Sequence, residues 1–385
     1  MMNLFLFLSF AFIFTFIVGR WLEKIRVPWI FAALLFGTGL AVYNPFESVT
    51  SGSTFKLLAE LGMYFLLFMI GLEIDLGEFK KASKFIVKST LFIILFEALF
   101  GTMIVHYLFG YTWIISIVVA LSFATVGEAI LIPILDEFKM VNTKLGQAII
   151  GIGTLDDVFE LITLVLAVGL IGSKTSVGVN FSIIMLSLIV LAVLSFALTK
   201  LRKEGKKIKI FKVETLFFLV IALFFLFIGV GEYADSAAIA ALIAGVSIKT
   251  FIPKERLHKI EDEVRAVCYG LFAPIFFLSV GAEMNLEYLI AYPLLVIIIV
   301  AVSKSAKIMG SWIAGHKELG TKKSVLLGIG LSVRFSTSII IITMLYNAGV
   351  VDKGLFSVIV ASSIAFKFIV PVLFANLLVK WGAEG

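Results

Sequence analysis

The chain is 385 residues long, and 61% of them are hydrophobic while only 15% are charged. Because soluble globular domains carry about 25% charged residues, this composition excludes a protein that lives mainly in water. The formal net charge is +6, but the basic residues lie in alternate loops and not along one stripe, which argues against nucleic acid as a partner. The single cysteine, Cys268, rules out a disulfide framework or a cysteine metal cluster within one chain.

Apolar segments recur along the whole chain, each close to the roughly 20 residues that cross the hydrocarbon core of a bilayer. Arg20 and Trp21 follow the first segment in place of the small residues of a cleavage site, so we expect this segment to be retained as a helix. We predict an all-α integral membrane protein of about thirteen transmembrane helices. They are expected near 2–20, 27–43, 54–72, 84–109, 112–136, 142–172, 179–201, 213–230, 234–250, 257–281, 288–314, 322–346 and 354–380.

The basic residues also predict how the chain is oriented in the membrane. One alternating set of loops is rich in Lys and Arg, for example Lys80, Lys81 and the cluster over 200–212, while the opposite set holds little beyond Lys174 and Lys353. Since cytoplasmic loops carry the excess of Lys and Arg, we expect the N-terminus outside and the C-terminus in the cytoplasm. The expected location is the inner (cytoplasmic) membrane of the cell.

An internal repeat with an offset of about 210 residues is visible. Chance similarity between apolar helices explains any one match, but three matches in the same order indicate a duplication. We predict repeat one over 1–172, a linker helix over 173–205 and repeat two over 206–385. Equivalent helices then start on opposite sides of the membrane, which is an inverted-topology repeat of the kind that transporters use. The matching segments are 32–37 with 240–245, 68–76 with 278–286, and 121–131 with 331–341.

Ionisable residues within the predicted helices are the strongest indication of function, because each costs about 2.5–3.5 kcal/mol on membrane insertion scales unless it is paired or hydrated. Equal numbers of acids and bases suggest that they neutralise one another inside a bundle. For Glu97 and Lys367 a structural ion pair or helix contact is the favoured interpretation. The acids are Glu97, Asp156, Asp157 and Glu160, and the bases are Lys304, Lys307, Arg334 and Lys367.

Asp156 and Asp157 are adjacent, so their side chains point about 100° apart on a helix, and Glu160 follows one turn later. Two close carboxylates push one pKa upward, so a proton and a metal cation can compete for the same oxygens. A hard monovalent cation prefers oxygen ligands, which this region offers. The alternative is that the acids only join helices through ion pairs, and for Glu160 both interpretations stay open.

Small, hydroxyl and helix-breaking residues interrupt two of the predicted helices at corresponding depths. The run 122–128, followed by Pro133, lies in the fifth helix, and the run 328–338, which includes Ser332, lies in the twelfth. Broken helices expose carbonyl groups and dipole ends near the bilayer midplane, and Glu128 or Arg334 could offset those dipoles. Close packing of small residues, which requires no break, is the alternative.

Lys304 and Lys307 lie three residues apart on one face of the eleventh helix, so either could pair with Asp156 and take part in proton coupling. Snorkelling or a structural ion pair is the alternative for each lysine. No phosphate loop, nucleophile triad or zinc spacing is present. We therefore expect neither enzymatic activity nor a cofactor.

These residues resemble the second monovalent cation:proton antiporter family, which includes Nha-, Nap- and Kef-type transporters. The resemblance covers nearly the whole chain, and the Asp pair is its most specific element. It rests on Glu60, Gly62 and the run 71–76, on Phe276 and Phe277 through Gly281, on Asp156 and Asp157, and on Pro371.

The resemblance implies a homodimer with a rigid dimerisation domain and a mobile core domain that holds two crossed, partly unwound helices. It implies that Asp157 binds the ion and that Asp156 pairs with a lysine. Lys307 fits the family's Lys-x-x-Gly pattern better than Lys304 does. A double Asp resembles the electrogenic exchangers of the family. One departure is that Arg334 lacks the acidic neighbour found in many relatives, so we expect it to pair with Glu128 or Glu160.

A second departure is that the sequence stops after its last predicted helix, so a Kef-type regulatory domain is not expected to act within this polypeptide. The expected function is exchange of Na⁺ or Li⁺ for H⁺ by an elevator-like mechanism. Asp157 would bind cation and proton in turn, Thr125 would complete the coordination, and an Asp156–Lys307 pair would open on cation binding. A K⁺/H⁺ exchanger, a cation channel and a non-transporting receptor or scaffold are the alternatives.

Overall fold

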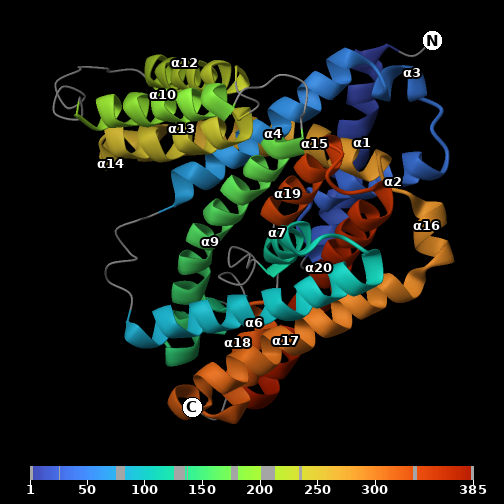
Figure 1. The fold of residues 1–385 in the computed structure, drawn as a ribbon, viewed down its shortest axis with the longest axis vertical. Helices are drawn as coiled ribbons and strands as arrows, with labels where there is room; N and C mark the ends of the chain where they lie inside the picture. The colour runs from blue at the N-terminus through green and yellow to red at the C-terminus, as the bar shows by residue number, and fades with distance from the viewer. Residues whose placement is uncertain are drawn as a thin grey trace. The chain divides into compact units, whose positions relative to one another are not determined.

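The computed structural model describes residues 3–25, 27–74, 83–124, 135–136, 138–174, 181–200, 213–233, 236–332 and 336–382. Within these ranges every regular element is a helix (Figure 1). Seven of the described helices are long and apolar enough to cross a membrane, and five shorter apolar helices accompany them. The prediction of an all-α membrane protein is therefore confirmed.

The helices divide between two compact units. The first unit comprises residues 1–18, 32–74 and 168–283. In it, α13 packs against α4, α10 and α12, and Figure 1 shows α10, α12 and α13 side by side. Its helices are the first part of α1 (Leu4–Lys24), most of α2 (Phe31–Val42), α3 (Glu47–Thr50), α4 (Ser53–Glu73), α10 (Phe181–Lys200), α12 (Val213–Glu232), α13 (Ala237–Phe251), α14 (Lys254–Val267) and α15 (Ala273–Ala282), with a π-helical turn over Cys268–Phe272.

Glycines allow the helices of this first unit to approach until backbones touch. A Cβ added to Gly37 of α2 would lie 2.0 Å from the Leu278 carbonyl oxygen of α15, and one added to Gly245 of α13 would lie 2.3 Å from the Phe68 carbonyl oxygen of α4. These two contacts correspond under the repeat, because Gly37 matches Gly245 and Phe68 matches Leu278. Matching positions of the repeat therefore make similar close contacts in this unit.

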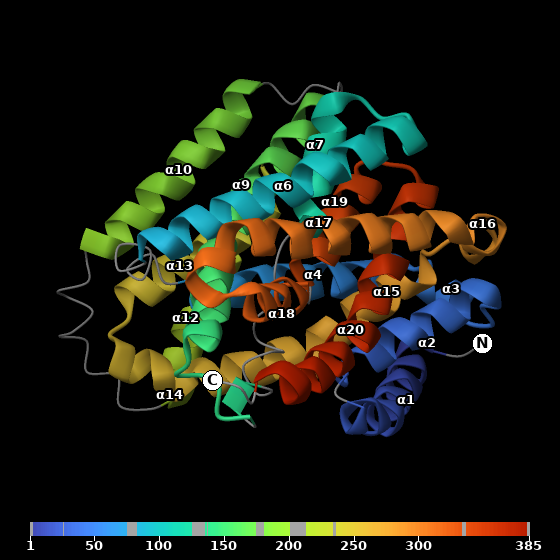
Figure 2. The ribbon, with the colours of Figure 1, turned by 90° about the horizontal axis from the view of Figure 1, so that it is seen from below.

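The second unit comprises residues 19–31, 75–167 and 284–385. Figure 2 shows α6 and α17 running alongside each other, and α17 also packs against α18 and α20. Its helices are α6 (Lys84–Phe109), α7 (Trp113–Ala124), α9 (Lys144–Lys174) as far as Ala167, α16 (Leu286–Ala291), α17 (Pro293–Leu319), α18 (Thr321–Gly330), α19 (Ser336–Asn347) and α20 (Lys353–Gly382).

Most predicted helices appear within a few residues of their expected bounds, and α6 matches its predicted range of 84–109. The prediction of one helix over 288–314 was wrong. The short helix α16 ends at Ala291, and α17 begins at Pro293 and continues to Leu319. Proline favours the first position of a helix because its ring fixes φ and its missing N–H has no partner there, which explains the new start.

The predicted interruption of the twelfth helix is confirmed, because α18 ends at Gly330 and α19 begins at Ser336. In the fifth predicted helix, α7 ends at Ala124, and residues 125–134 lie outside the described residues. The structure therefore separates the two halves of the twelfth helix, and the interruption expected in the fifth helix stays a prediction.

Candidate functional site

The candidate site lies in the second unit, between two helices whose buried faces carry polar groups. In α6 the buried positions recur every three or four residues, and Glu97 lies on this face between Ile94 and Gly101. In α17 the buried positions include Ser303 and Lys307, which are four residues apart and therefore lie on one face. The packing of α6 against α17 brings these two faces together.

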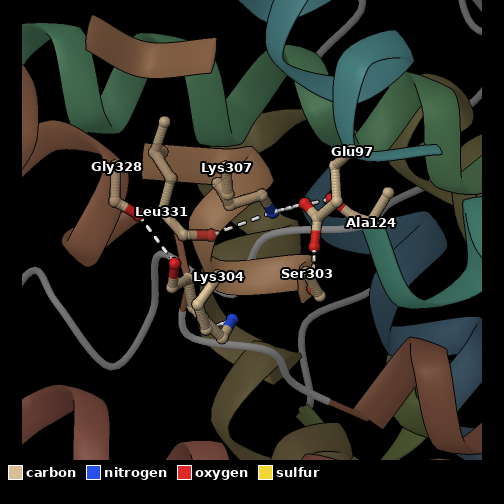
Figure 3. Close-up of polar contacts among 8 residues, drawn as sticks. Glu97, Ala124, Ser303, Lys304, Lys307, Gly328 and Leu331 are labelled. Atoms are coloured by element: carbon tan, nitrogen blue, oxygen red, sulfur yellow. Dashed lines mark hydrogen bonds and ion pairs between the residues drawn. The ribbon is translucent and has the colours of Figure 1, made fainter. Parts of the chain in front are cut away.

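Glu97 and Lys307 form an ion pair in this interface. The Lys307 Nζ lies 2.9 Å from the Glu97 Oε2, and both side chains are completely buried (Figure 3). The Ser303 hydroxyl donates a hydrogen bond to the other carboxylate oxygen, Oε1. Because α17 therefore offers a cation to one oxygen and a hydroxyl donor to the other, both oxygens of the Glu97 carboxylate are engaged.

Lys307 also binds the ends of two other helices. Its Nζ donates to the Ala124 carbonyl oxygen at 2.7 Å and to the Leu331 carbonyl oxygen at 3.1 Å. Ala124 is the last residue of α7, and Leu331 directly follows α18. The carbonyl groups in the last turn of a helix lack partners within the helix and carry its negative partial charge. One ammonium group thus stabilises the ends of both helices.

The second lysine of α17 has a different environment. Lys304 is only partly buried, and its Nζ donates to the Ser332 carbonyl oxygen at 2.5 Å. The same Nζ lies 3.6 Å from the centre of the Phe366 ring, which is a cation–π geometry. The Ser332 hydroxyl donates to the Gly328 carbonyl oxygen at 2.7 Å. Lys304 therefore stabilises the chain just beyond α18.

The aspartate pair lies on α9. The Asp156 side chain is completely buried, Glu160 is 7% exposed, and Asp157 is partly exposed. Ile149 and Ile152, up to two turns before the pair, belong to the same hydrophobic core as Ile93 of α6 and Leu331. The core therefore places the start of α9 in the bundle that also contains the Glu97–Lys307 pair.

Several predicted site residues cannot be placed. Thr125, Glu128 and Arg334 lie outside the described residues, as do Pro133 and 333–335. For Lys367, within α20, the side chain is not among those described. The proposed coordination by Thr125 and the proposed pairing of Arg334 with Glu128 or Glu160 therefore stay predictions.

The chain was compared with known proteins. The family model for the transmembrane part of sodium/hydrogen exchangers matches residues 9–381. The chain belongs to the sodium/hydrogen exchanger family. It is 27% identical over 372 residues to the probable Na⁺/H⁺ antiporter 3 of Methanocaldococcus jannaschii, with 94% of each chain covered. It is 26% identical over 329 residues to a Na⁺/H⁺ antiporter of Enterococcus hirae, with 82% of each covered.

A solved structure of the sodium proton antiporter MjNhaP1 from Methanocaldococcus jannaschii has the same fold as this exchanger family member. The TM-score is 0.62 at 18% identity, and the match covers 98% of this chain and 96% of the other. At this identity the likeness bears on the fold alone. It supports the helical architecture described above, which the sequence resemblance had led us to expect.

For this exchanger, sequence reasoning did not find the partner of Glu97. It favoured a structural ion pair or helix contact for Glu97, and it considered Lys307 as a partner for Asp156, with snorkelling or a structural ion pair as the alternative. Spacing along one helix could not reveal a contact between residues on α6 and α17. A usable signal existed nonetheless, since Glu97 is the only acid predicted inside the fourth helix, and Ser303 lies one turn from Lys307.

Proposed function

We propose that this exchanger moves Na⁺, or Li⁺, in exchange for H⁺, and that the carboxylates of Asp156 and Asp157 are the exchange site. The observation that carries the proposal is the aspartate pair on α9, with Asp156 completely buried and Asp157 partly exposed. A buried carboxylate is costly unless it binds a cation or a proton. Asp157 is the better placed of the two to receive an ion from water.

Family membership supports this activity independently of the site. Relatives that match over most of this chain are described as Na⁺/H⁺ antiporters. Carboxylate oxygens suit a hard cation such as Na⁺, and the same oxygens take up protons. Cation and proton would then occupy the site in turn, which gives exchange. We propose two protons for each Na⁺ if both aspartates titrate, and therefore electrogenic transport.

Further parts of the mechanism follow from the resemblance to cation:proton antiporters. The second unit, which holds the buried ionisable residues, would carry the site from one face of the membrane to the other in an elevator-like movement. Glu160, one turn beyond the aspartates, would assist in proton coupling. The chain would act as a homodimer.

The orientation proposed from the basic loops places the N-terminus outside and the C-terminus in the cytoplasm of the inner membrane. The direction of transport would be Na⁺ outward and H⁺ inward. Binding of an antibody to a C-terminal epitope only after the cells are permeabilised would support this orientation. Binding in intact cells would contradict it.

The experiment is transport by the purified protein in liposomes with an internal pH dye and an imposed proton gradient. Addition of Na⁺ or Li⁺ should drive proton movement and generate a voltage, and Asp157→Asn should abolish both because the exchange carboxylate is gone. Asp262→Asn is the matched control, since it makes the same change at an exposed position of α14. A response to K⁺ alone would replace the proposal by K⁺/H⁺ exchange, and an active Asp157→Asn variant with unchanged coupling would contradict the site.

A further inference from the structure

The second unit contains a buried carboxylate that the aspartate site does not use. Glu97 lies on α6, completely buried, and both of its oxygens are engaged by α17: Oε1 accepts from the Ser303 hydroxyl, and Oε2 lies 2.9 Å from the Lys307 Nζ. Lys307 is the lysine that the resemblance assigns to Asp156. The structure thus gives this lysine an acidic neighbour that is not on α9.

The position of the Lys307 ammonium is fixed from several directions. Three acceptors on three helices lie within 3.1 Å of its Nζ: the Glu97 carboxylate of α6, the Ala124 carbonyl at the end of α7 and the Leu331 carbonyl after α18 (Figure 3). An ammonium group has three N–H donors. A group that joins three helices in this way moves with them and does not swing freely toward a transient partner.

The internal repeat gives a second and independent argument. Lys307 and Glu97 are separated by 307 − 97 = 210 residues, which is the offset of the repeat. The same offset maps α6, Lys84–Phe109, onto 294–319, within one residue of α17. Glu97 and Lys307 are therefore equivalent positions of the two repeats that touch each other, so they lie on the pseudo-two-fold axis that relates those repeats.

Position on this axis matters for alternating access. In an inverted repeat the outward-facing and inward-facing states arise as the two halves exchange their arrangements. Residues on the axis keep the same relation to each other under that exchange, whereas residues away from it change partners. The Glu97–Lys307 contact is thus of the kind that persists in both states.

We propose that Glu97 is the resident counter-ion of Lys307 and that it holds the ammonium group in place on the ends of α7 and α18 throughout the cycle. This inference rests on the exchange function proposed above and assigns Glu97 a positioning role in it. When the cation binds, the exchanged proton leaves a carboxyl O–H of the aspartate pair for water on the open side. The cation takes over the freed oxygens, and the three N–H bonds of Lys307 stay intact.

Without Glu97, Lys307 would need another acidic partner. Asp156 would be the acid left to balance it, so the ammonium would compete with the cation for the oxygens of the aspartate pair. Loss of Glu97 should therefore raise the Na⁺ concentration at which exchange is half-maximal. A merely structural role would lower the amount of active protein and leave that concentration unchanged.

The first half of the test is a double-mutant cycle on the stability of the purified full chain in detergent. Glu97→Gln and Lys307→Met should each lower the melting temperature by several degrees, because each leaves one buried group without its partner. The double variant should lose much less than the sum, since both charges are removed together. Glu318→Gln is the control, because it removes a carboxylate from an exposed position of α17. Additive losses in the double variant would overturn the pairing.

The second half measures the KM for Na⁺ in liposomes, which is the Na⁺ concentration at half-maximal exchange. This KM should rise several-fold in Glu97→Gln, because Lys307 then competes with the cation for Asp156, and it should return to the wild-type value in Glu97→Asp, which restores the charge. It should also return toward the wild-type value in Glu97→Gln/Lys307→Met, because no ammonium is left to compete. A KM that stays raised in that double variant, or an unchanged KM in Glu97→Gln, would overturn the inference. Absence of exchange in the wild type would refute the proposed function instead, and the stability cycle would still report on the pair.

Discussion

In the first unit, glycines let the backbones of neighbouring helices pack in direct contact. In the second unit, polar side chains connect neighbouring helices across their interface. Gly71 of α4 and Gly245 of α13 face each other, and a Cβ on Gly71 would lie 2.2 Å from the Leu242 carbonyl oxygen. In the second unit, α6 and α17 present Glu97, Ser303 and Lys307 to each other. The same repeat therefore supports two kinds of helix packing.

The difference fits the rigid domain and the mobile core domain that the family resemblance implies. Close backbone packing depends on shape and leaves little freedom, as expected of a rigid support. Buried ion pairs and capped helix ends contribute less net stability, but they hold charges at defined positions, which an exchanger needs. We therefore expect the first unit to be sensitive to added volume and the second to lost polar groups.

The largest effect is expected from added volume in the first unit. Gly37→Ala places a methyl group 2.0 Å from the Leu278 carbonyl oxygen, so α2 and α15 must move apart. Overpacking costs about 1–3 kcal/mol in general, and the upper end applies because the obstacle is backbone. The melting temperature of the purified protein should fall markedly.

Gly39→Ala is the matched control for this change. It makes the same substitution two residues further along α2, where nothing lies within 4 Å of the added Cβ. Its stability should be unchanged or slightly higher, since alanine favours helix over glycine by about 1 kcal/mol. Equal melting temperatures for the two variants would show that the close contact does not limit the packing of this unit.

A smaller effect is expected from a lost polar group in the second unit. The Tyr111 hydroxyl donates to Asp352 Oδ2 at 2.7 Å and accepts from the Asp352 N–H at 2.8 Å. Tyr111→Phe removes both bonds and should lower the free energy of unfolding by about 1–2 kcal/mol. Tyr107→Phe is the control, because Tyr107 is exposed and keeps its ring contacts with His106 and Trp113. Similar losses in the two variants would refute the role of this contact.

The same tyrosine predicts a pH dependence. Burial, followed by the hydrogen bond and charge of Asp352, raises the pKa of Tyr111 above its ordinary value of 10.0. Above pH 10.0 the folded chain keeps the Tyr111 proton that the unfolded chain loses. The contribution of this proton to the stability of the fold is therefore complete below pH 10.0 and is lost as the pH rises further. The stability advantage of the wild type over Tyr111→Phe should therefore shrink in melts above pH 10.0.

The smallest effect is expected from a lost charge in the first unit. Arg265 of α14 lies 3.0 Å from Glu73 and 3.6 Å from Glu261, and all three side chains are about one-third to one-half exposed. Exposed ion pairs contribute roughly 0.2–1 kcal/mol and are screened by salt. Arg265→Gln should lower the melting temperature slightly at low salt and not at high salt. A large loss independent of salt would mean that this unit also relies on charge.

The sequence predicted the fold well because the bilayer imposes a simple rule. A spanning segment must be long, apolar and helical, since no water is present to satisfy its backbone. The ranges of α4, α6 and α12 follow from hydropathy alone, and the repeat was visible in segments such as 68–76 and 278–286. The start of α17 was missed because Pro293 acts through local backbone geometry and hardly changes the hydropathy of the window.

The candidate site was predicted only in part. Asp156, Asp157 and Lys307 were identified from the cost of placing charge in a membrane, a property that each residue carries wherever it packs. The partners of Lys307 could not be found in this way, because an ion pair is a distance between atoms, and Ser303 and Glu97 are 206 residues apart in the chain.

What the sequence determined by itself is that this chain spans a membrane, carries matching segments at an offset of about 210 residues and places acids and bases inside its helices. Only the tertiary structure decided which acid meets which base, because helix packing and not spacing along the chain brings α6 against α17 and the ends of α7 and α18 to the same ammonium. Hydrophobicity is a property of single segments, whereas charge pairing belongs to the folded bundle.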